Sequence, residues 1–392
     1  MTTYDPLQLV GTLLDHKYQV ENLVGQGGFG LVYRAIDIKL EKPVAIKCLK
    51  VPWAIEPKIR SAFLAKFKEE AQILFSLSEQ TLGVVRSLTA GDVVAPSGIW
   101  APYFVLQWLD GESLEDLLTR RREQGNKGRP LSEVIQWLDG PAQALTVAHA
   151  NNIAHRDIKP ANLMVMRQDG RVVTGPPGVP TIKILDFGIA KVMDQNVPGG
   201  GKHASTLVVY SPRYAAPEQV NPAMAGLTGF HSDVYSFALV AIELLTDRQA
   251  VETNGLMEIL NPNVRPTQRT KGLQVGDEVE AVFARAFRVN PEERYQTIGE
   301  FWTALVNAAR ADSLRPGETV ELERRRDAER RLAPRQVSGL TTGVTAIAVG
   351  DYHTCALTSA GGVLCWGFNS KGQLGDNSTT NRHVPTPVKG FP

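Results

Sequence analysis

The stretch His155-Arg156-Asp157-Ile158-Lys159-Pro160-Ala161-Asn162-Leu163 decides the fold of this chain. It places a carboxylate (Asp157), an ammonium (Lys159) and an amide (Asn162) within six residues of a predicted loop. Asp157 can accept the proton of an attacking hydroxyl, and Lys159 can neutralise charge on a moving phosphoryl group. Asn162 can ligate a metal ion. The stretch therefore predicts a site for phosphoryl transfer.

A second acidic group lies downstream, in Asp186-Phe187-Gly188. These residues follow an apolar strand predicted over 182–185, which leaves the Asp186 carboxylate free for a divalent metal. Hard oxygen ligands such as Asp and Asn suit magnesium bound to a nucleotide. The 24 positions from Asn162 to Asp186 contain turn-forming runs at 168–170 and 175–178. We expect a longer surface hairpin there, with a docking element as the alternative.

Upstream, Gly25-Gln26-Gly27-Gly28-Phe29-Gly30-Leu31-Val32 forms a GxGxxGxV pattern between strands predicted at 18–24 and 31–36. Glycines let backbone N–H groups approach phosphate oxygens without a side chain in the way. In a dinucleotide fold the pattern would open a helix, and a Walker-type loop would continue into Gly-Lys-Ser/Thr. The sequence has neither feature, so both of those phosphate sites are excluded.

Lys47 lies 17 residues after Gly30, in the predicted strand that begins Val44-Ala45-Ile46-Lys47. From there it can reach phosphates held by the glycine loop. A carboxylate would have to hold this lysine, and the helix predicted over 63–74 offers one. We choose Glu70, with Glu69 as the alternative.

Together these motifs resemble those of eukaryotic-type (Hanks-type) serine/threonine protein kinases. The similarity covers about residues 18–308 and ends its signature set at Ala216-Pro217-Glu218. It implies an α+β fold of two lobes, a strand-rich N-lobe and a helical C-lobe. It also implies ATP and Mg²⁺ as cofactors, with Mn²⁺ able to substitute, and protein substrates that carry Ser or Thr. A catalytically inactive scaffold is the alternative, against which the intact Lys47, Asp157 and Asp186 argue.

The resemblance implies roles for individual residues. Asp157 and Lys159 would be catalytic, and Asn162 and Asp186 would bind the metal. Leu106 would be the gatekeeper beside the adenine, in front of a hinge at 107–109. The implied ATP-binding residues are Gly25, Gln26, Gly27, Gly28, Phe29, Gly30, Val32, Ala45, Lys47, Glu70, Leu106, Gln107, Leu109 and Leu163. Three residues would be structural: Glu218, Arg294, which pairs with it, and Asp233, which anchors the catalytic loop.

In this family the arginine before the catalytic aspartate receives a phosphate from the activation segment, and Arg156 has that position. Ser205 and Thr206 follow the glycine-rich run 198–201 and are the expected regulatory phosphorylation sites. Ser211 is interpreted as part of the substrate-facing loop. Tyr210 adds bulk there, where the family usually has a glycine.

Composition limits the remaining choices. The 392 residues include 42 Lys and Arg against 41 Asp and Glu, which argues against a globally basic nucleic-acid binder. No apolar run approaches the roughly 20 residues of a membrane span, and the N-terminus lacks the pattern of a signal peptide. Cys48, Cys355 and Cys365 form no CxxC pair, so we expect core thiols, no disulfide framework and a reducing, cytoplasmic location.

Four segments are predicted: an N-terminal extension (1–17), the kinase domain (18–308), a charged helical linker (309–337) and one incomplete repeat (338–392). A basic docking arm is the alternative for the linker. Within the last segment, 350–357 and 366–375 resemble one repeat of the regulator of chromosome condensation propeller family, which implies a short all-β unit and a protein partner. One blade cannot bury its faces alone. It therefore either joins copies from other chains or is a remnant of a longer ancestor, which we favour.

Overall fold

The computed structural model describes most of the chain in two compact units, Met1–Ser313 and Leu314–Pro392. The described residues are 4–27, 30–49, 57–168, 171–175, 179–187, 213–221, 228–251, 266–267, 269–273, 275–312, 337, 340, 343–350 and 353–390. Within these ranges no helix is both long and apolar enough to cross a membrane. Each unit is treated by itself.

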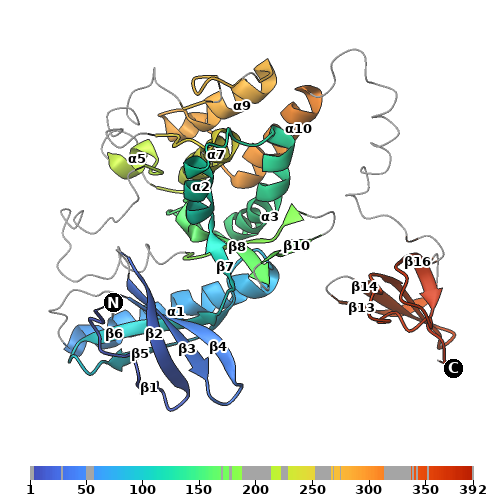
Figure 1. Ribbon diagram of the computed structural model, residues 1–392, viewed down its shortest axis with the longest axis horizontal. Coiled ribbons are helices and arrows are strands. Elements are labelled where there is room, and N and C mark those ends of the chain that lie inside the picture. The colour runs from blue at the N-terminus through green and yellow to red at the C-terminus, as the bar shows by residue number, and fades with distance from the viewer. Residues whose placement is uncertain are drawn as a thin grey trace. The chain divides into compact units, whose positions relative to one another are not determined.

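The first unit begins with a six-stranded sheet in the order β1-β2-β3-β4-β6-β5, in which all neighbours are antiparallel (Figure 1). Its strands are β1 (Leu13–Leu14), β2 (Tyr18–Gln26), β3 (Gly30–Asp37), β4 (Lys42–Leu49), β5 (Ser87–Val94) and β6 (Trp100–Gln107). The three strands predicted upstream of residue 50 are therefore present. Successive side chains point to opposite faces of a strand, so the sheet needs cover on both sides.

Helix α1 (Pro57–Gln80) covers one face of this sheet. Phe67 packs against Phe104 with ring centroids 4.4 Å apart, and Phe63 meets the edge of Trp100 at 5.9 Å. Phe63 and Phe67 are four residues apart and so lie on the same side of the helix. The helix is longer at both ends than the predicted 63–74.

The N-terminal strap, which we define as residues 4–17, packs against the other face. Leu7, Leu9 and Leu14 are buried among the side chains of that face. Asp5 accepts a hydrogen bond of 2.6 Å from the hydroxyl of Tyr33, and Asp15 accepts one from the hydroxyl of Tyr103. The strap is therefore part of the hydrophobic core of the sheet.

The helices that follow form the second lobe, at the opposite end of the unit from the large sheet (Figure 1). They are α2 (Leu114–Glu123), α3 (Leu131–Ala150), α5 (Pro217–Val220), α7 (Phe230–Thr246), α9 (Asp277–Ala286) and α10 (Ile298–Asp312). Every residue of α7 from Ser232 to Thr246 is buried, so this helix is the centre of the lobe.

Several short strands flank the loops that contain the predicted site residues. β7 (Gly111–Ser113), β8 (Leu163–Gln168), β9 (Arg171–Val172) and β12 (Ile182–Ile184) form one small antiparallel sheet. β10 (Thr174–Gly175) pairs with β11 (Val179–Pro180) in a hairpin. The extra residues between Asn162 and Asp186 therefore form the expected extended hairpin. Two 3-10 turns complete the unit, η1 (Pro160–Asn162) and η3 (Pro291–Glu293).

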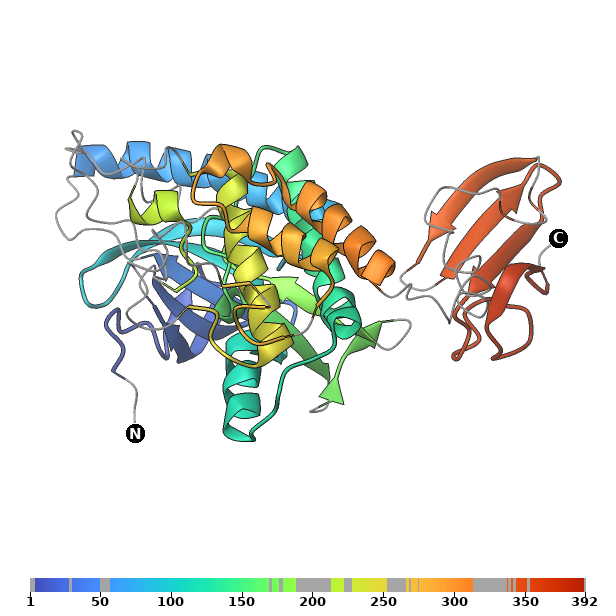
Figure 2. The same cartoon turned by 90° about the horizontal axis from the view of Figure 1, so that it is seen from above.

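The described residues of the second unit form a four-stranded antiparallel sheet, shown in red in Figure 2. Its strands are β13 (Val344–Val349), β14 (His353–Thr358), β15 (Val363–Gly367) and β16 (Arg382–Pro387). The buried amide of Asn369 organises the loop before β16: its nitrogen donates to Asp376 Oδ1 and its oxygen accepts from the N–H of Leu374. His353 lies half-buried on β14. The predicted helical linker falls mostly outside the described residues.

The prediction that Cys355 and Cys365 are core thiols is wrong. The register of β14 and β15 places them directly opposite each other, with Cα atoms 4.1 Å apart, and a disulfide joins them. Opposed residues of neighbouring antiparallel strands are close enough for such a bond. Cys48 is a buried free thiol, as expected, and its burial raises its pKa to about 12.

The contribution of the strap can be tested with two neighbouring residues. Leu9 is 1% exposed and Val10 is 44% exposed. Leu9→Ala leaves a cavity against the sheet and should lower the free energy of unfolding by about 2–5 kcal/mol, whereas Val10→Ala should change it by less than about 0.5 kcal/mol. Calorimetric unfolding of the full chain measures both. Equal stability of the two variants would contradict the packing of the strap.

Candidate active site

The catalytic loop, residues 155–163, is hydrogen-bonded to Asp233 in the first turn of α7. The carboxylate of Asp233 accepts main-chain hydrogen bonds of 2.7 Å from both His155 and Arg156. His149 on α3 adds a third contact, with its Nε2 at 3.0 Å from Asp233. Burial favours the neutral form of Asp233, but these hydrogen bonds outweigh it and keep its pKa below the usual range. The loop is therefore anchored to an ionised carboxylate in the core.

The loop brings three predicted site residues into contact. The Nζ of Lys159 lies 2.7 Å from Oδ2 of Asp157. The amide nitrogen of Asn162 donates to the main-chain carbonyl of Asp157 at 2.7 Å and to its Oδ2 at 3.1 Å. With its nitrogen committed in this way, Asn162 has its amide oxygen left to ligate a cation.

Lys47 and Asp186 meet between the two lobes, 139 positions apart in the sequence. The Nζ of Lys47, on β4, lies 2.5 Å from Oδ1 of Asp186. Burial favours the neutral form of Asp186, but the Lys47 ammonium outweighs it and holds the pKa of this carboxyl below its usual range. The ring of Phe187 packs on that of His155, with centroids 4.7 Å apart, which places Asp186 beside the catalytic loop.

The glycine loop is described at its two ends. Gly25 and Gln26 end β2, and the N–H of Gly27 donates to the carbonyl of Gly30 at 2.9 Å. A Cβ on Gly30 would lie 2.1 Å from the carbonyl oxygen of Cys48, so only glycine fits at the start of β3. Gly28 and Phe29 lie outside the described residues.

The predicted adenine-binding residues lie along neighbouring strands. Ala45 on β4 is opposite Leu106 on β6, and Val32 on β3 is opposite Lys47. Gln107 is exposed, and its N–H donates to the carbonyl of Arg86. Two buried leucines complete the set: Leu109, and Leu163 at the start of β8.

Glu218 and Arg294 form a fully buried ion pair, with Nη2 of Arg294 2.7 Å from Oε2 of Glu218. Ser232 donates to the other carboxylate oxygen at 2.6 Å. The pair joins the end of the activation segment to α7 and to the turn after η3. Removing one partner would leave a buried charge uncompensated.

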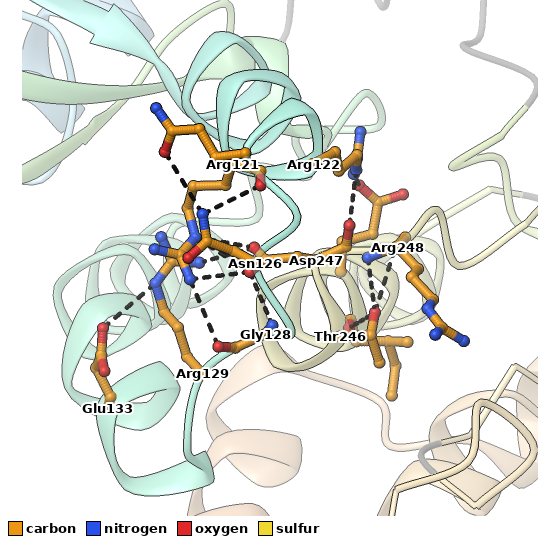
Figure 3. Close-up of polar contacts among 12 residues, drawn as sticks. Arg121, Arg122, Asn126, Gly128, Arg129, Glu133, Thr246, Asp247 and Arg248 are labelled. Carbon is orange, nitrogen blue, oxygen red and sulfur yellow. Dashed lines mark hydrogen bonds and ion pairs between the residues drawn. The ribbon is translucent and has the colours of Figure 1, made fainter.

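A set of arginines that the sequence did not single out ties α2 to the end of α7 (Figure 3). Asp247 accepts hydrogen bonds from Nη2 of Arg121 at 2.9 Å and from the N–H of Gly128 at 2.8 Å (Figure 3). Arg122 donates to Glu243 at 2.7 Å. These charges satisfy one another inside the lobe, so the arginine run of α2 is structural.

Glu243 also links this network to Tyr214, shortly before the end of the activation segment. The hydroxyl of Tyr214 donates to Oε2 of Glu243 at 3.1 Å. Burial raises the pKa of Glu243, even with Arg122 beside it. Tyr214 and Glu243 are 29 positions apart, and no local pattern in the sequence signals their contact.

Some predicted residues remain without a described environment. The side chain of Glu70 lies outside the described residues, although its backbone is part of α1, and Glu69 is exposed. The contact of Lys47 that is described is therefore the one with Asp186. Ser205, Thr206 and Ser211 also lie outside the described residues, whereas Arg156 is half-buried in the catalytic loop.

A strand-rich lobe and a helical lobe that bring two ammonium groups, two carboxylates and an amide together define the architecture of a protein kinase domain. The sequence model of the protein kinase domain matches residues 18–301, so the chain belongs to the protein kinase family. Two models of the regulator of chromosome condensation repeat match residues 344–373 and 360–392.

Several similar proteins with curated names come from bacteria. The serine/threonine-protein kinase PknB of Mycobacterium leprae is 30% identical over 298 residues, which cover 75% of this chain and 43% of the relative. A probable serine/threonine-protein kinase of Streptomyces coelicolor is 31% identical over 290 residues, 73% of this chain and 39% of the relative. The match thus spans less than half the length of these relatives.

Solved structures share the fold. The PknI kinase domain of Mycobacterium tuberculosis superposes with a TM-score of 0.52 at 21% identity, over 76% of this chain and 98% of that one. The apo form of PpkA-294 gives a TM-score of 0.53 at 22% identity, over 78% of this chain and all of that one. At such identities the likeness concerns the fold alone.

The buried pair Glu218–Arg294 predicts a large effect on stability. Arg294→Met should cost about 3–5 kcal/mol, because it leaves the Glu218 carboxylate unpaired in the core, and the double variant with Glu218→Met should recover part of that loss. The control is Arg288→Met, since Arg288 is 52% exposed and lies 3.6 Å from Glu293, and it should cost less than about 1 kcal/mol. Denaturant unfolding compares the three, and similar losses for both single variants would contradict the prediction.

Proposed function

We propose that this chain is a serine/threonine protein kinase that transfers the γ-phosphate of ATP to Ser and Thr hydroxyls of proteins. One observation carries the proposal: Asp157, Lys159 and Asn162 lie in direct contact on the catalytic loop, and the Lys47–Asp186 pair lies beside them. These are the groups that phosphoryl transfer from a metal-bound nucleotide requires. The serine/threonine names of the bacterial relatives support the choice of hydroxyl.

In the proposed reaction the substrate hydroxyl oxygen forms a bond to the γ-phosphorus, and the bond from that phosphorus to the bridging oxygen of ADP breaks. Asp157 orients the hydroxyl and accepts its proton. Lys159, 2.7 Å from Asp157, offsets negative charge on the phosphoryl group as it moves. Lys47 and the N–H groups of the glycine loop hold the phosphates of ATP.

The residues fit a magnesium ion. The lowered pKa of Asp186 keeps this carboxylate ionised, and Asn162 offers an amide oxygen, so both are hard oxygen ligands. When bound, Mg²⁺ neutralises charge on the nucleotide phosphates. Mn²⁺ accepts the same oxygen ligands and is expected to substitute.

The terminal repeat is proposed to take a protein partner. On β13 the side chains of Ile347 and Val349 are 65% and 76% exposed, and every residue of this strand is exposed. An uncharged, exposed strand at the edge of a sheet is prone to pair with other chains, which supports this proposal. The sequence alone favours a remnant of a longer ancestor, and that interpretation becomes the alternative because β13 is exposed along its whole length.

Two substitutions test the chemistry. Asp157→Asn should retain ATP affinity and lower the rate of transfer by about 10²–10⁴-fold, because the carboxylate acts on the hydroxyl and not on the nucleotide. Lys47→Met should abolish transfer, while Lys42→Met, at an exposed position on the same strand, should not. Labelled ATP with Mg²⁺, followed by mass spectrometry of the modified sites, measures the outcome. Wild-type rates in either site variant would refute the assigned roles.

Regulation is proposed to act through Arg156. Phosphate on Ser205 or Thr206 would pair with this guanidinium and order the activation segment. Replacing both residues with Ala should lower activity severalfold and remove phosphate from this segment. Unchanged activity together with no phosphate at either position in the wild-type protein would disprove the idea.

A further inference from the structure

The side chain of Gln219 joins two segments that the sequence keeps 63 positions apart. Its Oε1 accepts a hydrogen bond of 2.9 Å from the N–H of Ala216, at the end of the activation segment. Its Nε2 donates to the main-chain carbonyl of Arg156 at 2.8 Å. Gln219 is only 6% exposed, so water cannot readily replace either bond.

The carbonyl of Arg156 belongs to the peptide group that carries the N–H of Asp157. That N–H donates to Nδ1 of His155 at 3.2 Å, so both ends of this one peptide group are hydrogen-bonded. The orientation of the peptide sets the direction in which the Asp157 side chain leaves the backbone. Gln219 therefore acts on the peptide bond that joins Arg156 to Asp157, the residue with the proposed catalytic carboxylate.

Arg156 also adopts an unfavourable backbone conformation. Its φ is +68°, in the left-handed region that residues with a Cβ rarely occupy. Asp233 holds the N–H of this residue at 2.7 Å, and Gln219 holds its carbonyl. The strained residue is thus fixed from two sides, by Asp233 on α7 and by Gln219 on α5, which directly follows the activation segment.

We propose that Gln219 is a positioning residue, which sets the peptide group before Asp157 and couples it to the placement of Ala216. The proposal rests on the proposed function, because the role of Asp157 does. If Gln219 served only to cap α5, its acceptor oxygen on Ala216 would suffice. If it positions Asp157, the donor nitrogen on Arg156 is the essential half.

Two variants separate these roles. Gln219→Glu keeps an acceptor for Ala216 but sets a carboxylate oxygen against the carbonyl of Arg156, and Gln219→Leu removes both bonds. We expect kcat to fall about tenfold or more in both at pH 8, while KM for ATP stays within about twofold. The activity of Gln219→Glu relative to wild type should rise as the pH falls, because a protonated carboxyl can donate to Arg156. A structural role alone would not produce this pH profile.

The control is Gln296→Leu. The Gln296 amide donates to the carbonyls of Pro291 and Arg294, which are not part of the catalytic loop, and this variant should keep wild-type kcat. Gln219→Glu with wild-type kcat at pH 8, or Gln219→Leu within twofold of wild type, would overturn the proposal.

Hydrogen–deuterium exchange of the full chain gives a readout that does not depend on activity. Gln219→Leu should speed exchange in peptides covering residues 154–158 at least severalfold and leave those of α3 unchanged. No change at 154–158 would reject the positioning role, even if the protein showed no phosphate transfer. A wild-type protein without any transfer would refute the proposed function separately.

Discussion

One buried carboxylate holds the site together. Asp233 accepts the N–H groups of two consecutive residues of the catalytic loop, and it does so from α7, in which every residue from Ser232 to Thr246 is buried. A carboxylate in the core is unfavourable unless its oxygens are fully hydrogen-bonded, and here the loop itself supplies most of those bonds. The stability of the helical lobe and the conformation of the catalytic loop therefore depend on the same hydrogen bonds.

The contact between the lobes depends on a second set of main-chain bonds. Ile184 on β12 donates to Gly83 and accepts from Val85, in the connection between α1 and β5. Lys183 donates to the carbonyl of Leu82 in the same connection. Asp186 follows two residues later, so the strand that presents this carboxylate to Lys47 is attached to the lobe that carries the lysine. This attachment brings Asp186 within reach of Lys47, so the ion pair between the lobes can form.

The sequence was sufficient for the kinase fold and for naming residues that the structure brings into contact. Asp157, Lys159 and Asn162 lie within six residues, and Asp186 follows a visible apolar strand, so local patterns single them out. The direct contact of Lys47 with Asp186 could not be predicted in the same way, because it depends on how the two lobes pack. The contact of Gln219 with Arg156 is of the same kind, since nothing near either residue marks it.

The disulfide and the packing of the strap could not be predicted from the sequence, for two different reasons. The pairing of Cys355 with Cys365 can be predicted only if the register of β14 and β15 is known. A shift of one residue would place the two side chains on opposite faces of the sheet. They are ten residues apart on either side of the turn at 359–362, and a predicted hairpin register would have shown that they are paired. The strap has no strong hydrophobic periodicity, so its sequence does not show that its leucines are buried. Their burial depends on the sheet that they cover.

The strap also separates two definitions of the domain. The family match starts at Tyr18, where β2 begins, whereas the hydrophobic core already includes Leu7, Leu9 and Leu14. A protein trimmed to the boundaries of the family would open an apolar face and leave the hydroxyls of Tyr33 and Tyr103 without the carboxylates that now accept from them. The segment that precedes the family match is thus the one that covers this face of the sheet.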